Sequence, residues 1–573
     1  MYSTAKNVQI VIALLKAHGI SDLVISPGGT NAPFIRGVQD DPFFKCHSVV
    51  DERSALYYAI GIYLVTGKTV AMCCTSAQAT RNYIPGLTEA YYKHVPILAI
   101  TFSKHPQYIG QDYMQAPNQT SLPVDCVRKS FALPYVSNEH DRLHCERLAN
   151  EAMLEIVRNV PAPVQLNIPM LDNELGIDDT PLLPQVKVIR RYKCPDKNVC
   201  AFLRDKRILI VVGENRGVDV DTTALRDFAK ANEVVIYANQ LSNICNDYTV
   251  YGNRLMLWTS QQEFDETYCP DVLITVGGQT GDYPLYHKLA ETKRSYEHWR
   301  ISPGGEIVDT YDHLTKVFEC DYDEFFRCAG GGNGSGSYLT LWKEAVETQR
   351  IDVELPLSNA YLAQQLYRAI PDGSIVNFSI LNSLRVWNLF PLKSKCKCFS
   401  NVAAFGIDGC MSTFIGQSTQ TDALCFLIIG DLSFYYDMNS LGLRQIGRNV
   451  RILLVNNSGG MEFKYGGTVE SRKKIDQYIA AAGHFKNAKG WAETCGFEYC
   501  RINNKNDFDV IREKLVSPSE KSMVVEVFVD ERDENDSLNI LKQSNLKQTN
   551  FQDTRTFTDT VVGRLKREIR KIF

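Results

Sequence analysis

Short apolar segments alternate with longer amphipathic segments along most of the chain, and this alternation restricts the possible folds more than any other feature. The apolar segments lie at 22–26, 68–75, 96–101, 163–168, 207–213, 233–238, 271–277, 374–377, 423–429, 450–455 and 523–529. The helix-like segments between them include 7–18, 81–94, 140–159 and 359–370. Strands that are connected through helices form parallel sheets with helices on both faces. The sequence therefore predicts the α/β class, with three doubly wound parallel-sheet domains.

Two segments of unusual composition indicate where these domains end. The length of 573 residues corresponds to roughly three or four domains at about 150 residues each. The proline-rich segment 180–184 is typical of a linker, and the glycine-rich segment 330–337 is typical of a boundary or a surface loop. We predict the following division: a first domain at 1–182, a central α/β domain at 190–330, a linker at 331–357, a third domain at 358–550 and a helical tail at 551–573.

The predicted tail has the pattern of a basic amphipathic helix. Its apolar face carries Val561, Leu565, Ile569 and Ile572, and lysines and arginines fill the rest. Such a helix can lie on an anionic membrane surface. Because it more often packs on its own protein, we expect no membrane contact.

Charge, cysteine content and hydropathy exclude several classes of protein. The 62 basic and 66 acidic residues leave a net charge of −4, whereas nucleic-acid-binding proteins usually carry a basic excess. The 17 cysteines are scattered without any C-x-x-C pair, which favours buried, reduced thiols over a disulfide framework or a zinc site. The first residues contain no apolar leader segment, and no apolar run approaches the about 20 residues of a membrane span. We therefore predict a soluble, cytoplasmic protein that does not bind nucleic acid.

Two motifs, each at the end of an apolar strand, carry most of the functional information. The first strand ends in Gly430-Asp-Leu-Ser433, and the second ends in Asn456-Asn-Ser-Gly-Gly460. Glycine lets the backbone approach a phosphate closely, and ligands of open parallel sheets bind at the carboxyl ends of the strands. Asp431, Asn457 and a backbone carbonyl just beyond it would supply three oxygens to Mg²⁺, with diphosphate and water completing the shell. The pair of motifs predicts a site for Mg²⁺ and a diphosphate.

This pair of motifs resembles the diphosphate-binding motif of thiamin-diphosphate enzymes. Such enzymes also use a carboxylic acid against N1′ of the aminopyrimidine, which drives the proton transfer that activates the cofactor. The acid usually comes from the N-terminal domain, where Asp51-Glu52-Arg53 precedes the helix-like segment 55–64. A lone acid at a helix start is often only a cap or a dipole partner. Beside the diphosphate motif, the resemblance implies a catalytic role for Glu52.

Further motifs narrow the resemblance to the family of 2-succinyl-5-enolpyruvyl-6-hydroxy-3-cyclohexene-1-carboxylate synthases, over about residues 5–530. They occur in the same order as in that family: Ser26-Pro-Gly28, Asp51-Glu-Arg53, Gln115-Ala-Pro-Asn-Gln119, Gly406-Ile-Asp-Gly409, Gly430-Asp-Leu-Ser433 and Asn456-Asn-Ser-Gly-Gly460. The resemblance implies that the domain at 1–182 binds the pyrimidine and that the domain at 358–550 binds the diphosphate. It also implies a homodimer or tetramer, with Glu52 of one subunit facing Asp431 and Asn457 of another.

The resemblance assigns roles to further residues. It places Ile407 under the thiazolium ring, Gln115 beside the reacting carbon and the carbonyl of Gly459 on Mg²⁺. The complete set of implied cofactor-binding residues is Glu52, Gly406, Ile407, Gly430, Asp431, Leu432, Ser433, Asn457, Gly459, Gly460 and Met461. The implied substrate-binding residues are Gly29, Thr30, Lys104, Gln115, Arg385 and Phe463.

The substrate positions depart from the family pattern. Gly29 and Thr30 replace a serine and an arginine, and Val402 replaces an arginine. Asp282 and Tyr283 replace a lysine and an arginine. Arg385 matches the arginine of the family pattern only when the alignment is shifted by one residue. The family binds 2-oxoglutarate and isochorismate, and bound carboxylates need charge-assisted donors. We therefore expect an intact cofactor site with a different donor or acceptor.

Together these features predict an enzyme that uses thiamin diphosphate and Mg²⁺. It would decarboxylate a small-molecule 2-oxo acid and transfer the acyl carbanion to a carbonyl or alkene acceptor. A simple 2-oxo acid decarboxylase and a non-catalytic protein that binds the cofactor are the alternatives. The retention of Glu52 with Asp431 and Asn457 speaks against the non-catalytic alternative. A flavin-containing relative of acetolactate synthase has no clear G-x-G-x-x-G motif to support it.

Overall fold

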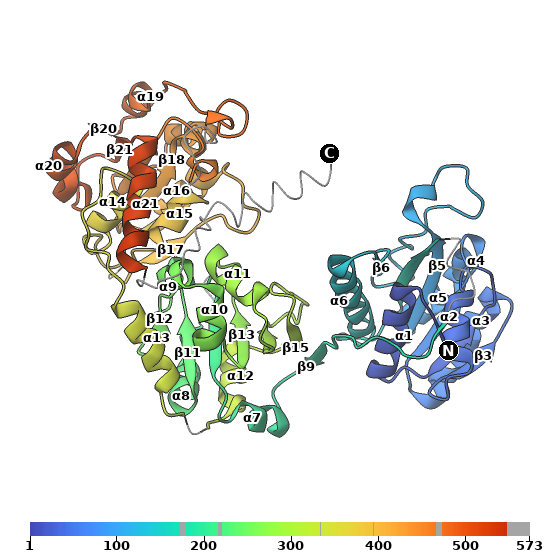
Figure 1. The fold of residues 1–573 in the computed structure, drawn as a ribbon. Helices are drawn as coiled ribbons and strands as arrows, with labels where there is room; N and C mark the ends of the chain where they lie inside the picture. The colour runs from blue at the N-terminus through green and yellow to red at the C-terminus, as the bar shows by residue number, and fades with distance from the viewer. Residues whose placement is uncertain (172–178, 216–219, 333, 393–394, 466–472, 547–573) are drawn as a thin grey trace. The chain divides into compact units, whose positions relative to one another are not determined.

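The computed structural model describes residues 1–171, 179–215, 220–332, 334–392, 395–465 and 473–546 (Figure 1). The chain forms two compact units, one of residues 1–193 with 305–319 and the other of residues 194–304 with the chain from 320 onward. Three parallel sheets, each combined with helices, confirm the predicted α/β class. The division into domains stays a prediction, and the predicted tail at 551–573 lies outside the described residues.

The first unit contains a six-stranded parallel sheet in the order β3-β2-β4-β5-β7-β6. Its strands are β2 (Asp22–Ile25), β3 (Lys45–Ser48), β4 (Val70–Cys74), β5 (Ile97–Lys104), β6 (Ser130–Ala132) and β7 (Val164–Met170). Its helices are α1 (Lys6–His18), α2 (Ala32–Gln39), α3 (Glu52–Thr66), α4 (Gln78–Asn82), α5 (Ile84–Tyr92), η1 (Pro106–Tyr108) and α6 (Glu139–Glu155). The central strands β4, β5 and β7 are buried over their whole lengths, as expected for a sheet that is covered on both faces.

Two parts of the first unit differ from the sequence prediction. The helix predicted at 81–94 is divided into α4 and α5 near Tyr83, because Pro85 at the start of α5 has no N–H for a continuous helix. The segment predicted as a linker at 180–184 begins with a strand: β8 (Asp179–Thr180) pairs antiparallel with β1 (Tyr2–Ser3). A second strand pair of this unit, β9 (Arg190–Tyr192) with β15 (Leu314–Phe318), is parallel.

The second unit contains five adjacent parallel strands in the order β12-β11-β10-β13-β14. They are β10 (Ile208–Val212), β11 (Val234–Tyr237), β12 (Thr249–Val250), β13 (Val272–Val276) and β14 (Glu297–Ile301). The accompanying helices are α7 (Lys197–Leu203), α8 (Thr223–Ala231), η3 (Gln240–Ser242), α9 (Asn253–Trp258), α10 (Gln261–Glu263), η4 (Phe264–Tyr268), α11 (Tyr283–Glu291), α12 (Tyr322–Ala329) and α13 (Ser337–Glu347). Helices α8 and α12 lie against each other, with the rings of Phe228 and Phe326 5.5 Å apart.

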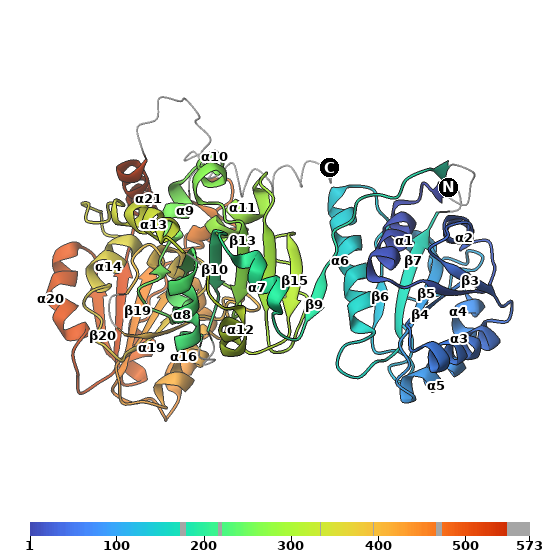
Figure 2. The same ribbon diagram turned by 90° about the horizontal axis from the view of Figure 1, so that it is seen from below.

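A second sheet of this unit has six parallel strands in the order β17-β16-β18-β19-β21-β20, of which β19 and β20 are labelled in Figure 2. Its strands are β16 (Ile375–Phe378), β17 (Lys397–Phe399), β18 (Cys425–Gly430), β19 (Val450–Asn456), β20 (Glu498–Ile502) and β21 (Met523–Phe528). Its helices are α14 (Asn359–Leu366), α15 (Asn382–Trp387), α16 (Cys410–Ser418), α17 (Asp431–Tyr436), η5 (Met438–Gly442), η6 (Met461–Phe463), α19 (Lys489–Thr494), α20 (Lys505–Leu515) and α21 (Glu531–Asn545). Separate apolar clusters cover its two faces.

The glycine-rich segment is held as a surface loop where the structure describes it. The N–H groups of Gly332 and Gly334 both donate to the carbonyl of Ala231 at 3.1 Å. The Glu233 carboxylate accepts from the backbone N–H groups of Ser335 and Gly336. Helix α13 follows inside the range predicted as a linker, and its Trp342 is completely buried. Part of that range is therefore folded chain that contributes to a core.

All 17 cysteines are free thiols, as the sequence predicts. Nine of them are buried, including Cys73 and Cys74 on β4 and Cys425 on β18. Burial raises the pKa of Cys73 to about 12, which makes its thiolate scarce. Among the described residues, none of the helices combines the length and the hydropathy that crossing a membrane requires.

Candidate active site

The carboxyl ends of β18 and β19 bring the two predicted motifs together. These strands pair in parallel, with Gly430 opposite Val455. Asp431 begins α17 directly after β18, and Asn457 directly follows the end of β19. Since parallel neighbours end at the same edge of a sheet, both side chains lie where open α/β sheets bind their ligands.

The Asp431 carboxylate is buried and accepts several hydrogen bonds. Its Oδ1 accepts from the N–H of Leu432 at 2.7 Å, and its Oδ2 accepts from the N–H of Gly459 at 3.1 Å. His484 Nε2 lies 2.9 Å from the same Oδ2. Burial raises the pKa of Asp431, and the neighbouring His484 opposes this rise. The motifs gave no sign of His484, because it lies 53 positions away in the chain.

The surroundings of Asn457 fit a bound cation. Its Oδ1 is buried and has no hydrogen-bond partner among the described residues. A buried acceptor without a donor costs stability, which a cation at this position would restore. The described residues contain no group of three or more His, Cys, Asp or Glu side chains that could hold a metal alone. One carboxylate, one amide and a backbone carbonyl suit Mg²⁺, which commonly takes its remaining oxygens from phosphates and water.

Glycine is required where the loop after β19 passes another segment. A Cβ atom on Gly459 would lie 2.9 Å from the Cα of Ala482 and 3.0 Å from the carbonyl oxygen of Ala480. The N–H of Gly460 donates to that same carbonyl at 2.5 Å. Side chains at these positions would therefore push the loop away from residues 480–482. Met461, the next predicted residue, is buried.

The loop before α16 is fastened to the start of α17. Ser433 Oγ donates to the carbonyl of Ile407 at 2.5 Å, and Ser379 Oγ donates to Ser433 Oγ at 3.1 Å. Gly406 and Ile407 are half-buried. Leu432, on the first turn of α17, is half-buried as well. The structure thus gathers the cofactor-binding residues predicted in the third domain, and their roles stay predictions.

The remaining predicted residues lie in the first unit. Glu52 is the first residue of α3, and its Oε2 accepts from Asn82 Nδ2 at 3.1 Å. Thr30 is buried, and its N–H donates to Thr75 Oγ1 at 3.3 Å. Gly29 precedes it, and a Cβ there would meet nothing within 4 Å.

Lys104 and Gln115 differ in exposure. Lys104 ends β5 and is buried, with its Nζ 5.8 Å from the centre of the Tyr113 ring. Gln115 is exposed and has a φ of +59°. Non-glycine residues rarely adopt this conformation, and such strain is frequent at functional sites. The roles of both residues stay predictions.

At two of the altered substrate positions, the side chain is buried and contacts only other residues of the fold in the described part of the chain. Val402 is completely buried in an apolar cluster. Asp282 is buried at the start of α11, where it accepts from the hydroxyl of Tyr237 at 2.5 Å and from the N–H of Leu285 at 3.0 Å. Burial raises the pKa of Asp282.

Arg385, the predicted substrate-binding arginine, already has a carboxylate partner. It forms an ion pair with Glu462, which the sequence analysis missed although it lies between Met461 and Phe463. With the Asn382 amide oriented to satisfy both groups, that amide donates to Glu462 Oε2 and accepts from the Glu462 N–H, each at 2.8 Å. Phe463, by contrast, is half exposed. A charged residue two positions beyond the motif glycines was the available signal for Glu462.

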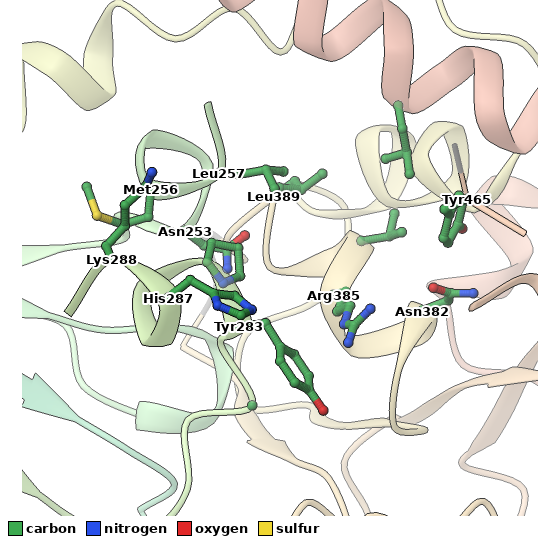
Figure 3. Close-up of a pocket in the computed structure, with 14 residues that line it drawn as sticks. Asn253, Met256, Leu257, Tyr283, His287, Lys288, Asn382, Arg385, Leu389 and Tyr465 are labelled. Carbon is green, nitrogen blue, oxygen red and sulfur yellow. The ribbon is translucent and has the colours of Figure 1, made fainter. Parts of the chain in front are cut away.

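A cavity of about 180 Å³ lies beside this ion pair (Figure 3). Arg385 reaches it from α15, and the guanidinium lies 4.3 Å from the centre of the Tyr283 ring at the start of α11. The lining is completed by side chains of α9, α11, α15, α21 and the segments after α15 and η6: Asn253, Met256, Leu257, Pro284, His287, Lys288, Asn382, Val386, Leu389, Tyr465 and Leu538, with Gly281.

Comparisons with known proteins agree with the resemblance of the motifs. The family model described as "Thiamine pyrophosphate enzyme, N-terminal TPP binding domain" matches residues 6–122. A protein of Bacteroides thetaiotaomicron is 33% identical over 546 residues, covering 92% of this chain and 96% of the relative. Relatives from Phocaeicola vulgatus and Desulfotalea psychrophila are 32% and 30% identical, covering 92% and 90% of this chain and 96% of each relative. All three are named 2-succinyl-5-enolpyruvyl-6-hydroxy-3-cyclohexene-1-carboxylate synthase.

Proposed function

This chain belongs to the thiamin-diphosphate-dependent 2-succinyl-5-enolpyruvyl-6-hydroxy-3-cyclohexene-1-carboxylate synthase family of carboligases, and we propose that it uses Mg²⁺ but joins a different donor or acceptor. The donor is a 2-oxo acid that loses CO₂, and the acceptor is a carbonyl compound or an activated alkene. The observation that carries this proposal concerns the ends of two paired strands. Buried Asp431 follows one strand, and the other is followed by an Asn457 Oδ1 that lacks a partner among the described residues.

In this proposal, one set of residues binds Mg²⁺ and the diphosphate, and Glu52 transfers the proton. Asp431, Asn457 and the carbonyl of Gly459 hold Mg²⁺, while Gly430 and Gly460 leave the backbone free to approach the diphosphate. Glu52 holds a proton at N1′ of the aminopyrimidine and thereby activates the cofactor. When bound, thiamin diphosphate supplies the carbon that adds to the donor and holds the electron pair released with CO₂. Ile407 and Gln115 orient the groups around that carbon.

The altered substrate positions support the change of substrate. Binding of a carboxylate depends on charge-assisted donors at fixed positions. Val402 offers an apolar side chain that is completely buried, and Asp282 offers a carboxyl whose hydrogen bonds cap α11. Neither residue donates to an anion. Arg385 carries the required charge, but Glu462 already neutralises it.

Release of CO₂ from a panel of 2-oxo acids tests this function. The panel is run with thiamin diphosphate and Mg²⁺, it includes 2-oxoglutarate, and it is repeated with and without isochorismate. We expect release from a smaller or less acidic donor, and no release from the Asp431→Ala variant. A product formed from 2-oxoglutarate only when isochorismate is present would show that the substrates are unchanged. Accumulation of the free aldehyde despite added acceptors would instead favour a simple decarboxylase.

We further propose a homodimer or tetramer, with each active site built from two chains. In this arrangement Glu52 of one chain faces Asp431 and Asn457 of the other. The placement of Glu52 in one compact unit and of Asp431 in the other is compatible with such sharing. The location that we propose for the enzyme is the cytoplasm.

A further inference from the structure

The cavity beside Arg385 carries an inference that rests on the proposed function and extends it to the class of acceptor. We propose that this cavity binds an uncharged, single-ring acceptor, and that Glu462 is the residue that excludes a carboxylate from it. Glu462 is thus a specificity-determining residue that acts through the charge of Arg385.

The topology places the cavity wall at the same sheet edge as the motif residues. Strand β16 pairs with β18, and β18 pairs with β19, all in parallel. Helix α15 follows β16, α17 follows β18, and η6 follows β19, so Arg385, Asp431 and Glu462 all lie beyond the carboxyl ends of neighbouring strands. Glu462 is also only three positions beyond Gly459, which is a predicted Mg²⁺ ligand. A molecule in the cavity is therefore next to the segment that holds the diphosphate.

Two of the three basic side chains of the cavity wall contact carboxylates of the same chain. Arg385 is paired with Glu462, and His287 Nδ1 lies 2.9 Å from Glu291 Oε1. Burial lowers the pKa of Lys288, and the nearby acids, Glu291 first, only oppose this shift. Because Arg385 and His287 already contact internal carboxylates, a carboxylate that approached either of them would have to displace an internal one. The charge pattern therefore favours an uncharged ligand.

The Arg385–Glu462 pair is more than a surface contact. The two side chains are only 25% and 16% exposed, and Asn382 forms two hydrogen bonds of 2.8 Å with Glu462, one to its carboxylate and one from its backbone N–H. A partly buried ion pair with extra hydrogen bonds is costly to break, because each charge would be left without its partner. Glu462 consequently occupies the position on Arg385 that a substrate carboxylate would otherwise take.

The size and the lining of the cavity indicate a single ring. A cavity of about 150 Å³ lined by aliphatic and aromatic side chains binds benzene, and this one measures about 180 Å³. Met256, Leu257, Val386 and Leu389 supply aliphatic surface, and Figure 3 shows the Tyr283 ring beside Arg385. An aromatic or alicyclic aldehyde has the required shape and charge.

The reaction with such an acceptor balances without any further reagent. The donor R–CO–COO⁻, a proton and the aldehyde R′–CHO give R–CO–CH(OH)–R′ and CO₂. The bond between the carboxylate and carbonyl carbons of the donor breaks. Its electron pair forms the new bond to the aldehyde carbon, and the aldehyde oxygen takes the proton.

Binding of two ligands of equal shape tests the charge argument. Nitrobenzene and benzoate differ mainly in charge, and their affinities for the holoenzyme can be measured by ligand-observed NMR. We expect wild type to prefer nitrobenzene by about tenfold or more, because the Arg385 guanidinium is already paired with Glu462 and does not bind benzoate. Glu462→Gln keeps an amide for Asn382 but frees Arg385, and should tighten benzoate binding by about tenfold or more while nitrobenzene binding stays nearly unchanged. Equal affinities in both proteins would overturn the proposal.

Two further variants keep this test decisive. Glu531→Gln is the matched control, because Glu531 pairs with a different cation of the same region, Lys464. It should leave the preference of wild type unchanged. Leu257→Trp fills the cavity from a partly exposed position and should weaken nitrobenzene binding, which decides the question if Glu462→Gln does not fold. Unchanged binding in Leu257→Trp would place the ligand elsewhere and refute the cavity.

The release of CO₂ from the donor separates this inference from the proposed function. A protein that releases CO₂ but shows no preference between the two ligands refutes the acceptor class and leaves the carboligase proposal standing. A protein with the expected preference but no release with any donor refutes the proposed function, while the selectivity of the cavity is upheld.

Discussion

Asp431 and Glu52, the two carboxyls to which we assign the chemistry, differ in their surroundings. Asp431 is buried and receives N–H groups from Leu432 and Gly459, so its position is fixed before a cation binds. Glu52 is half-buried and accepts from Asn82. The fixed carboxylate suits a metal ligand. The more accessible one suits a group that exchanges a proton with a bound molecule.

We expect Glu52→Gln to bind thiamin diphosphate but to lose catalysis. The amide keeps the size and a hydrogen bond, yet it cannot supply the proton at N1′ that activation requires. Exchange of the cofactor's C2 proton, followed by NMR, should fall by at least about a hundredfold. Glu89→Gln, which alters an exposed pair with Lys93, should exchange at the normal rate. Normal exchange in Glu52→Gln would remove this residue from the activation step.

Asp431→Ala should abolish the dependence of cofactor affinity on Mg²⁺. The variant lacks the only carboxylate of the proposed metal site, and calorimetric titration with and without Mg²⁺ measures the loss. Asn457→Ala should weaken the same dependence, since it removes the Oδ1 that lacks a partner in the described chain. Asp509→Ala, at an exposed position on α20, serves as the control. If Mg²⁺ still strengthens binding in Asp431→Ala, the metal lies elsewhere.

At the scale of elements, helix α21 docks on the start of α14 through a buried acid. Glu534 accepts from the N–H of Asn359 at 3.2 Å and from the hydroxyl of Tyr465 at 3.4 Å. Ser537 Oγ lies 2.7 Å from Ser358 Oγ, the cap of α14. Burial raises the pKa of Glu534 to about 7. The segment after the diphosphate motif is thereby tied to an acid that titrates near neutral pH.

This raised pKa predicts that Glu534 makes stability depend on pH. The folded protein binds the proton more tightly than the unfolded chain, whose glutamate titrates near 4.5. The contribution is therefore fully present below pH 4.5 and is lost as the pH rises to about 7, by about 3 kcal/mol. Calorimetric melting between pH 4.5 and 8 should show the wild-type midpoint falling relative to that of Glu534→Gln. A constant difference between the two proteins would contradict the shift. The exposed Glu513→Gln should follow wild type.

The elements themselves were largely predictable from local sequence. The strand predicted at 450–455 is β19 at Val450–Asn456, and that predicted at 523–529 is β21 at Met523–Phe528. Such segments are continuous apolar runs because strands of covered parallel sheets are buried on both faces. The prediction of a single helix at 81–94 was wrong. The apolar residues continue with helical spacing across the position where Pro85 interrupts the helix.

For the molecule as a whole, the proposed sharing of active sites between chains predicts complementation. Two inactive variants, Glu52→Gln and Asp431→Ala, are produced separately and together. In a mixed dimer one site combines both changes, and the other contains neither. Random association should therefore restore about a quarter of wild-type activity, because half of the dimers are mixed and each has one intact site. Activity that stays at the background level would show that each site comes from a single chain.

The sequence by itself determined the α/β class, the family and the strand ends that carry Asp431 and Asn457. These properties are readable because they depend on runs and motifs whose members are close together in the chain. Only the tertiary structure decided that Arg385 is paired with Glu462 and that His484 contacts Asp431, over separations of 77 and 53 positions. Contacts of this kind depend on how elements pack, which no local pattern encodes. The same holds for the cavity, because its walls come from helices that follow different strands.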